Sequence, residues 1–427
     1  MLERNKAPEV SDIIDLSLPR YEEVTLLDGR RVYYAPTDIT NLMVVDFIIP
    51  SENQDAEKAN VAALLADMFD KSNELYTEDE MADITDQIAL EMNVYATRHD
   101  FTIRMTFMRE HFATVADITG LMLCRNSLKE DEFNALKERA ISTAEIQSDM
   151  AEYAVSRLLL KKVGGTFLTE RIFTDAEALR SITVDDLRRV YSRLSGKDMK
   201  IVIIGKMQPK DWEKLNDRKY YTDEFLHRSM PRQTFTLNEV TDYEPTVVHN
   251  SSEVQTNIDA CLRLPVDYRH EDYDALDLLA TILADSATSS RMNQNIREEK
   301  GYTYGVNGYL QPLDTESLLH FYTSCNSDKT DLVLEEMKRE IRRIASVPVS
   351  EDELLQAKKT FFARTAKSID TPVSLIGPLR EQMLYPGRFE SRISTVKSLT
   401  SQELLRLARK YFDAQRLLVA IITGTET

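Results

Sequence analysis

The chain has 427 residues, and 42% of them are hydrophobic, which excludes wholesale disorder and predicts packed interiors. A chain of this length is expected to form two or three domains. Its 53 Lys and Arg residues stand against 71 Asp and Glu residues, so the formal net charge is −18. This balance argues against nucleic acid or an anionic membrane as the main partner and favours basic peptides, although it can also serve solubility alone.

The cysteines and the N-terminal residues bear on the compartment. Cys124, Cys261 and Cys325 are too few and too scattered for a disulfide framework or a thiolate zinc site. The first nine residues lack the apolar core of a signal peptide, and no apolar run approaches the roughly 20 residues that span a bilayer. We therefore expect a cytoplasmic protein without a membrane span, or a periplasmic one if a leader has been removed.

The first half of the chain opens with strand signals. Residues 24–34 contain two strand-like runs around Asp28-Gly29, which is a strong hairpin signal. Leu42–Pro50 predicts a more buried strand, and residues 56–69 predict an apolar helix. Further on, residues 94–107 indicate two strands that meet near 97–100.

Later helices are announced by capping signals. Pairs with the spacing of a capping box are Thr77 with Glu80, Ser127 with Glu130, and Thr183 with Asp186. The second pair predicts the start of one long helix that runs to about Lys162. Lys200–Gly205 then reads as a closing strand.

The second half of the chain repeats the order of the first half. The matching pairs are 48–50 with 262–265, 64–67 with 282–285, 129–132 with 350–353, 181–187 with 398–404, and 200–205 with 417–424. Each match alone is weak, but their constant order and nearly constant offset indicate a tandem duplication of an α/β unit of about 200 residues.

These patterns predict an α+β fold made of two similar domains. Strands and helices come in blocks, and the hairpin implies antiparallel pairing, so we expect each domain to be a mainly antiparallel sheet with helices packed on one face. The expected domains are 1–212 and 239–427. The linker between them, 213–238, contains no glycine and should make contacts rather than hang free.

Residues 296–310 contain the first candidate site. Arg297 lies in the charged end of a predicted helix, and Gly301 is a typical left-handed residue for closing it. A strand pattern follows, and the turn could bring Arg297 and Tyr304 to one place. A guanidinium and a phenol hydroxyl can together donate to a peptide carbonyl or to the oxyanion that it becomes. The alternative is that Arg297 only complements the helix dipole and that Tyr304 is only a surface side chain of a strand.

The duplication, the Leu-Asp-Gly-Arg-Arg-Val hairpin and the Arg-Glu-Glu-Lys-Gly-x-x-Tyr sequence resemble the pitrilysin/insulinase-type zinc metallopeptidases. The mitochondrial processing peptidase and its bacterial relatives are the most similar in size. The resemblance covers nearly the whole chain. It implies the processing-peptidase fold and substrates that bind as extended strands against a sheet edge.

The metal motif of that family is vacant here. Active members carry His-x-x-Glu-His on the first-half helix, with a later Glu as the remaining ligand. This chain has Ala63, Ala66 and Asp67 at the places of the two histidines and the general base, and only Glu145 is positioned as a vestige of the later acid. No two of the six histidines are four residues apart. We therefore expect no zinc or other cofactor bound by this chain.

The resemblance implies the metal-free subunit of a two-chain peptidase, inactive alone and active with a zinc-bearing homologous partner. In that role Arg297 and Tyr304 would hold a peptide or unfolded-protein substrate and stabilise its oxyanion. A second hypothesis is a structural or peptide-binding homologue without a peptidase role. A third, a zinc peptidase with unusual ligands, is disfavoured because Asp67 and Glu145 offer no nitrogen or sulfur. Whether the partner is a different chain or a second copy stays open at this point.

Overall fold

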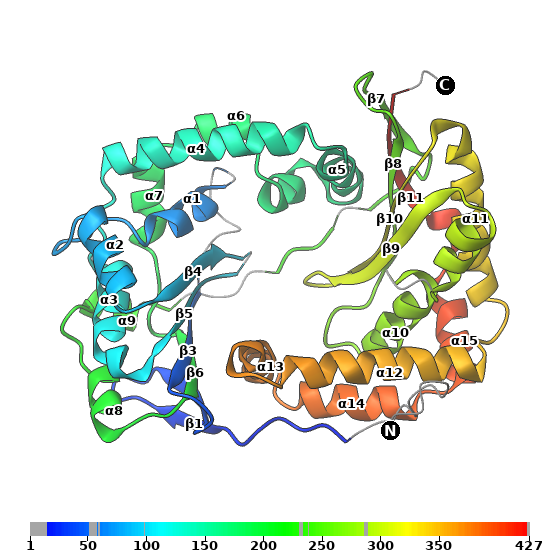
Figure 1. The fold of residues 1–427 in the computed structure, drawn as a ribbon. Helices are drawn as coiled ribbons and strands as arrows, with labels where there is room; N and C mark the ends of the chain where they lie inside the picture. Colours follow the sequence, from blue (N-terminus) through cyan, green and yellow to red (C-terminus); the bar gives the residue numbers. More distant parts are fainter. Residues whose placement is uncertain are drawn as a thin grey trace, which may run out of the picture.

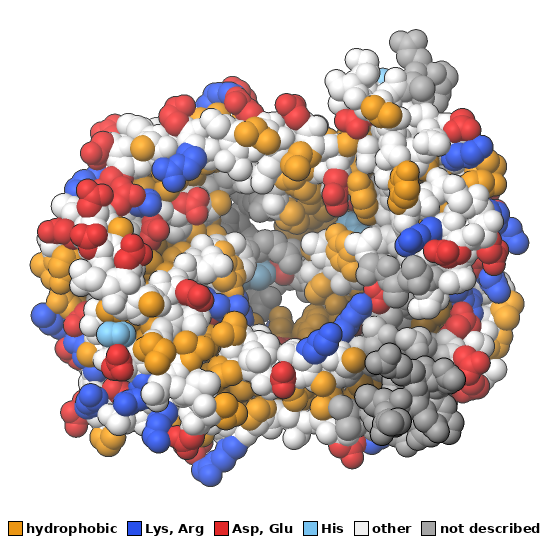
Figure 2. Space-filling model, in the orientation of Figure 1, with side chains coloured by type: hydrophobic (Ala, Val, Ile, Leu, Met, Phe, Trp, Pro, Cys, Tyr) orange, Lys and Arg blue, Asp and Glu red, His pale blue; other side chains and the backbone are white. Residues whose placement is uncertain are grey.

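The computed structural model describes residues 15–50, 58, 60–97, 99–229, 234–237, 239–285 and 289–424. Two α+β halves, each built around its own sheet, lie on either side of a central hollow (Figures 1 and 2). Figure 2 shows hydrophobic side chains along the walls of this hollow. No helix in the described ranges combines the length and the apolarity needed to cross a membrane.

The first sheet has the strand order β1-β2-β6-β3-β5-β4. Its strands are β1 (Glu22–Thr25), β2 (Arg31–Pro36), β3 (Leu42–Pro50), β4 (Glu91–Ala96), β5 (Asp100–Met108) and β6 (Lys200–Gly205). Neighbouring strands are antiparallel except β2 and β6, which are parallel. The predicted hairpin is confirmed as β1–β2, and Gly29 at φ +88° supplies the left-handed residue in its turn.

The second sheet repeats this arrangement in the order β7-β11-β8-β10-β9. Its strands are β7 (Thr246–His249), β8 (Thr256–Leu264), β9 (Thr303–Pro312), β10 (Ser317–Cys325) and β11 (Leu418–Thr423). The pair β7–β11 is parallel, as β2–β6 is, and the other pairs are antiparallel. The sequence repeat therefore corresponds to a repeated fold, and β4 and β9 are equivalent edge strands.

The outer face of each sheet is covered by helices of its own half. In the first half these include α1 (Val61–Met68), α3 (Phe112–Cys124), α4 (Glu130–Ser148) and α7 (Val184–Tyr191). In the second half they include α10 (Tyr273–Ala284), α11 (Thr330–Ile344), α12 (Glu351–Ser368) and α15 (Ser401–Tyr411). The predicted helix at 56–69 is observed from Val61, and residues 56, 57 and 59 lie outside the described part.

The inner face of each sheet is covered by a helix from the other half (Figure 1). Helix α5 (Ala151–Ile172) of the first half packs Val155 and Leu159 against β11 and β8 of the second sheet. Helix α13 (Pro372–Leu384) of the second half packs Leu375 and Leu379 against β3 and β6 of the first sheet. Burying each such leucine contributes about 2 kcal/mol, so this exchange ties the two halves together.

The remaining elements are short or peripheral. They are α2 (Glu78–Gln87), α6 (Ala176–Arg180), α8 (Pro209–Leu215), α9 (Asp223–His227), α14 (Arg388–Ser398), the 3₁₀ turns η1 (Arg109–His111), η3 (Ser327–Lys329) and η4 (Ala414–Arg416), and the π-helix η2 (Asn293–Glu299). Helix α8 spans the expected 212/213 boundary, and α9 buries Phe225 and Leu226 in the first-half core.

Two of the capping predictions are confirmed and one is wrong. Thr77 and Thr183 both form capping boxes. The helix expected from Ser127 instead begins after Lys129, without a side-chain cap. Leu128 has φ +41°, so the chain turns once more before it becomes helical. The single helix expected to reach Lys162 is also broken, because α4 ends at Ser148 and α5 begins at Ala151.

Candidate functional site

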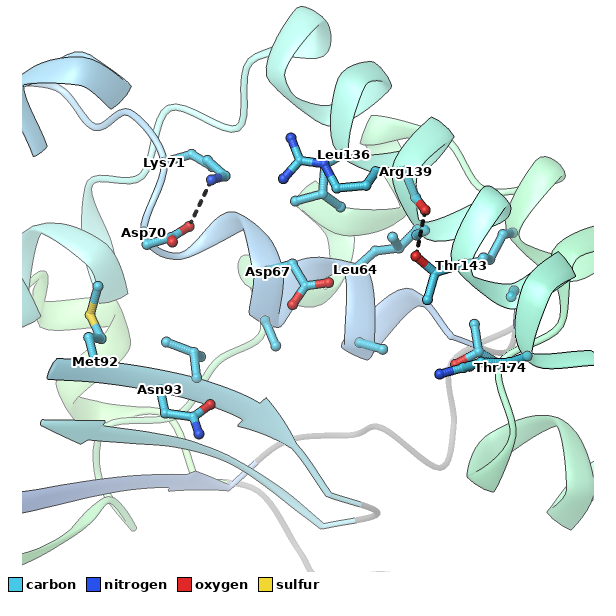
Figure 3. A pocket seen from close by; sticks show the side chains of 17 residues that line it. Leu64, Asp67, Asp70, Lys71, Met92, Asn93, Leu136, Arg139, Thr143 and Thr174 are labelled. Carbon is cyan, nitrogen blue, oxygen red and sulfur yellow. Dashed lines mark hydrogen bonds and ion pairs between the residues drawn. The ribbon is translucent and has the colours of Figure 1, made fainter. Parts of the chain in front are cut away.

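The vacant metal-motif residues of α1 face a cavity of about 520 Å³. Val61, Leu64, Leu65 and Met68 anchor α1 in the first-half core. Ala63 and Asp67 are four residues apart and lie together on the face that lines the cavity. Helix α4 forms the opposite wall, and the edge strand β4 closes one side through Met92 and Val94 (Figure 3).

The donor atoms around this cavity do not fit zinc. Asp67 and Asp70 supply carboxylates, and the cavity lining contains no histidine and no cysteine. Zinc sites rely on imidazole or thiolate ligands, whereas carboxylates alone suit harder cations. Within the described ranges, no group of three or more His, Cys, Asp or Glu residues could hold a metal ion. Ala63 and Ala66 offer no ligand atom at all.

Asp67 is the one motif residue that retains chemistry. Its side chain is exposed to the cavity, and no described residue forms a hydrogen bond or ion pair with it. Partial burial and the neighbouring Asp70 raise the pKa of the Asp67 carboxyl, against the opposing effect of Lys71 and Arg139. Lys71 is itself engaged, with Nζ 3.4 Å from Asp70 Oδ1 and 2.9 Å from Glu78 Oε1.

Glu145 does not face this cavity. Its carboxylate forms an ion pair with Arg180 of α6, whereas Thr143, Ala144 and Gln147 are the neighbouring α4 residues that line the wall. The structure therefore places Glu145 away from the position expected of a vestigial ligand. Successive helix positions differ in direction by about 100°, which is why Glu145 points away from the cavity while its neighbour Ala144 lines it.

The Arg297/Tyr304 candidate site lies at the end of η2 and the start of β9. Gly301 has φ +63° and its N–H donates to the Arg297 carbonyl at 3.0 Å, as expected of a helix-closing residue. Arg297 Nε lies 3.2 Å from Glu298 Oε1. The side chain of Tyr304 is 82% exposed. Both side chains are exposed, and among the described residues no hydrogen bond joins Arg297 to Tyr304.

The sequence did not reveal the contacts that hold the edge strand β4 in place. Arg380 of α13 donates to Tyr95 Oη at 3.1 Å and to Thr102 Oγ1 at 2.6 Å, and it pairs with Asp100 Oδ1 at 3.0 Å. These contacts cross from the second half to the first. Nothing in the local sequence signals such a clamp, because it depends on the exchange of α13 between the halves.

A second contact also joins the two halves. The turn after β4 reaches the turn after β9, where His99 Nε2 lies 2.8 Å from Asp314 Oδ1. The ends of the two edge-strand hairpins are thereby linked beside the central hollow.

Comparison with known proteins supports a peptidase relationship. The family described as Peptidase M16 inactive domain matches residues 181–361. An uncharacterized zinc protease of Bacillus subtilis, YmxG, is 21% identical over 380 residues, covering 87% of this chain and 90% of the relative. An uncharacterized zinc protease of Rickettsia felis is 34% identical over 139 residues, which cover 32% of this chain and 34% of that protein.

Solved structures share the fold over nearly the whole chain. A peptidase M16 inactive domain from Pseudomonas fluorescens superimposes with a TM-score of 0.84 at 14% identity, covering 95% of this chain and 99% of that one. A protease from Helicobacter pylori gives a TM-score of 0.84 at 16% identity, with coverages of 95% and 100%. At these identities the likeness establishes the fold alone.

Proposed function

Because the chain belongs to the M16, pitrilysin/insulinase-type peptidase family and lacks its zinc motif, we propose that it is the non-catalytic, substrate-binding subunit of a heterodimeric zinc metallopeptidase. The observation that carries this proposal is the open cavity at the motif, whose lining contains no imidazole or thiolate that could bind zinc. In this assignment residues 1–212 carry the vacant site, 213–238 form the linker, and 239–427 carry Arg297 and Tyr304. The zinc would belong to a homologous partner.

The edge strands supply the means of binding a peptide. Among the described strands, β4 and β9 each pair with one neighbour, so each is the edge of its sheet. On β9 the side chain of Asn293 already bonds the N–H and the carbonyl of Val306, which leaves β4 as the more open edge. Both strands lie beside the central hollow in Figure 1. An extended peptide could add to either strand by backbone hydrogen bonds, which tolerate many sequences. Binding of peptides or unfolded segments is therefore the part of the proposed function that the geometry supports most directly.

Arg297 and Tyr304 are the proposed contribution to catalysis. The guanidinium and the phenol hydroxyl would donate to the scissile carbonyl of a peptide held in the partner's active site, and would stabilise the oxyanion as it forms. Their exposure supports this role, because a group that serves a partner has to be accessible. Removal of one such donor typically raises the barrier by about 3 kcal/mol.

A second candidate function is a structural or peptide-binding homologue without a peptidase role. The geometry at η2 favours this reading, because the guanidinium of Arg297 already pairs with Glu298 and forms no hydrogen bond with Tyr304 among the described residues. In this case both side chains would be inherited surface residues. Peptide binding would persist in the absence of any zinc-bearing partner, and no partner would gain activity from this chain.

Reconstitution distinguishes the two functions. The chain is mixed with a homologue that carries His-x-x-Glu-His, and cleavage of an unfolded protein is measured for each component alone and for the mixture. We expect activity only in the mixture, and a loss of about 100-fold with Arg297→Ala. Arg416→Ala is the matched control, since Arg416 is also an exposed arginine with one nearby carboxylate, Asp413 at 3.6 Å. Unchanged activity with Arg297→Ala would refute the catalytic role, and absence of activity in the mixture would favour the second function.

A further inference from the structure

The internal repeat shows what the Asp67 carboxylate can bind. The sequence Leu-Ala-Asp ends at Asp67 in the first half and at Asp285 in the second half. In the second half, Arg364 of α12 reaches this carboxylate, with Nη2 2.7 Å from Asp285 Oδ2. The fold therefore contains one copy of the site in which the acid is neutralised by a guanidinium.

The first half lacks the corresponding arginine. Helices α4 and α12 share the sequence Glu-Asp-Glu near their starts, and counting along both helices from the shared Asp places Thr143 where α12 has Arg364. Thr143 lines the cavity but is uncharged, and its hydroxyl donates to the Arg139 carbonyl at 3.0 Å. The cavity is also larger in the first half, about 520 Å³ against about 240 Å³ beside Asp285.

The nearby cations of the first half do not fill this gap. Lys71 is engaged by Asp70 and Glu78. Arg139 projects over the cavity in Figure 3, and no ion pair joins its guanidinium to Asp67 or to any other described residue. Lys71 and Arg139 therefore act on the Asp67 carboxylate only without direct contact. A carboxylate that has no hydrogen bond or ion pair with a described residue, in a cavity large enough for a long side chain, is suited to a cation that arrives with a ligand.

The wall formed by β4 suggests how that cation would arrive. A peptide added beside this edge strand would point alternate side chains to the face of the sheet that carries Met92 and Val94, and these two residues line the cavity. We infer that the vacated metal site is a pocket for a basic side chain, Arg or Lys, of a peptide bound along β4, with Asp67 as its acceptor. This inference rests on the proposed peptide-binding function and adds a preference to it.

The test uses the full-length chain and peptides of matched shape. Fluorescein-labelled decapeptide pools of Ala, Ser and Thr, acetylated at the N-terminus, carry Arg, citrulline or Glu at one central position, and binding is followed by anisotropy. Citrulline keeps the shape of arginine without its charge. We expect the Arg pool to bind about fivefold to tenfold more tightly than the citrulline pool, as for a charge-assisted hydrogen bond at a partly open site.

Variants connect this preference to the pocket. Asp67→Asn should remove the preference for Arg, whereas Asp70→Asn, which alters the neighbouring carboxylate, should keep it. Thr143→Arg should also remove it, because the new guanidinium would occupy the pocket as Arg364 does in the second half. Asp67 and Thr143 lie on the cavity wall rather than in the core, so both variants should fold. As a check without variants, the Arg peptide should lower the pKa of the Asp67 carboxyl, followed by carbon NMR.

The outcomes separate this inference from the proposed function. Equal binding of the Arg and citrulline pools would overturn the basic-residue pocket and leave peptide binding intact. Failure of every pool to bind would overturn peptide binding itself. Preference for the Glu pool, lost in Arg139→Ala, would show that the cavity takes an anion through Arg139 and would also overturn the inference. A preference for Arg that survives both Asp67→Asn and Thr143→Arg would place the basic residue elsewhere.

Discussion

Replacement of Arg380 by methionine tests whether the second half fixes the edge strand of the first. The side chains of Arg380 and Asp100 are only 15% and 14% exposed, and the guanidinium also serves Tyr95 and Thr102. Removing one member of a buried ion pair costs about 3–5 kcal/mol. Because the pair retains some contact with solvent, we expect a loss near the lower limit, about 3 kcal/mol. Methionine keeps the apolar length of the side chain, so the loss reports the charge and its hydrogen bonds.

Hydrogen exchange resolves this effect by position. In Arg380→Met the amides of β4 and β5 should exchange faster by the factor that corresponds to about 3 kcal/mol, roughly 100-fold. Amides of β8 and β10 should change little, because the hydrogen bonds of Arg380 go to residues of β4 and β5 in the first sheet. The double variant Asp100→Asn/Arg380→Met should lose less than the sum of the single variants. Peptide binding at β4 should weaken as well, since this strand forms one wall of the cavity.

Two results would refute this reasoning. Unchanged exchange in β4 and β5 would show that α13 holds the first sheet through its apolar contacts alone. Uniform acceleration over the whole chain would show that Arg380 stabilises the molecule globally rather than the edge strand. Arg416→Met is the control for loss of an arginine at an exposed position, where the side chain is 73% exposed, and it should leave both patterns unchanged.

Three further predictions follow from the second half. Gly301→Ala should lower the free energy of unfolding by about 1–2 kcal/mol in urea denaturation, because Gly301 has φ +63°, although an added methyl group would meet no atom within 4 Å; no loss would mean that the turn relaxes. Burial opposes ionisation of Glu353, but hydrogen bonds from Arg291 and Ser350 outweigh it and lower its pKa from 4.5 to about 2. Such a carboxylate stabilises the fold above its unfolded pKa, and this stability is lost as the pH falls through the folded pKa, so between pH 4.5 and 2 the wild type should lose about 2 kcal/mol relative to Glu353→Gln, after allowance for the 32% exposure of Glu353. Parallel curves of stability against pH would contradict this. Tyr304→Phe should leave unfolding unchanged, because the side chain is 82% exposed, and should lower the activity of a reconstituted pair about 100-fold; a destabilised variant would instead point to a structural role.

Local signals in the sequence predicted most of the secondary structure. The Asp28-Gly29 hairpin, strand Leu42–Pro50 and the capping boxes at Thr77 and Thr183 are all observed, because each depends on residues within one turn or one strand. The repeat was visible because duplication keeps the order of elements even where identity has been lost. These signals were sufficient for the α+β class and for two sheets of the same design.

Contacts between distant segments could not be predicted in the same way. The exchange of α5 and α13 between the halves depends on tertiary packing, and the sequence contains no local mark of which sheet a helix will cover. Likewise the break between Ser148 and Ala151 has no proline or glycine to announce it. The direction of Glu145 is a further example, since the sequence placed it on α4 but could not show that its carboxylate pairs with Arg180 instead of facing the cavity.

Only part of the cavity at the vacated motif could be predicted from the sequence. Ala63, Ala66 and Asp67 were identified as substitutions of a metal motif, and the structure places all of them on its wall. The contrast between Thr143 and Arg364 was also present in the repeat, but its meaning requires the knowledge that α4 faces α1 as α12 faces α10. The charge of the proposed ligand could therefore be inferred from Thr143 and Arg364 only once the packing of these helices was known.

Metal content and peptide binding, measured on the same sample of the isolated chain, test the central claim most directly. The chain is purified, its zinc is quantified, and binding and cleavage of an unfolded protein are followed with and without a chelator. We expect no stoichiometric zinc, no cleavage, and binding that is unchanged by the chelator. Stoichiometric zinc together with cleavage that the chelator abolishes would contradict a peptide-binding chain that leaves the metal chemistry to a partner.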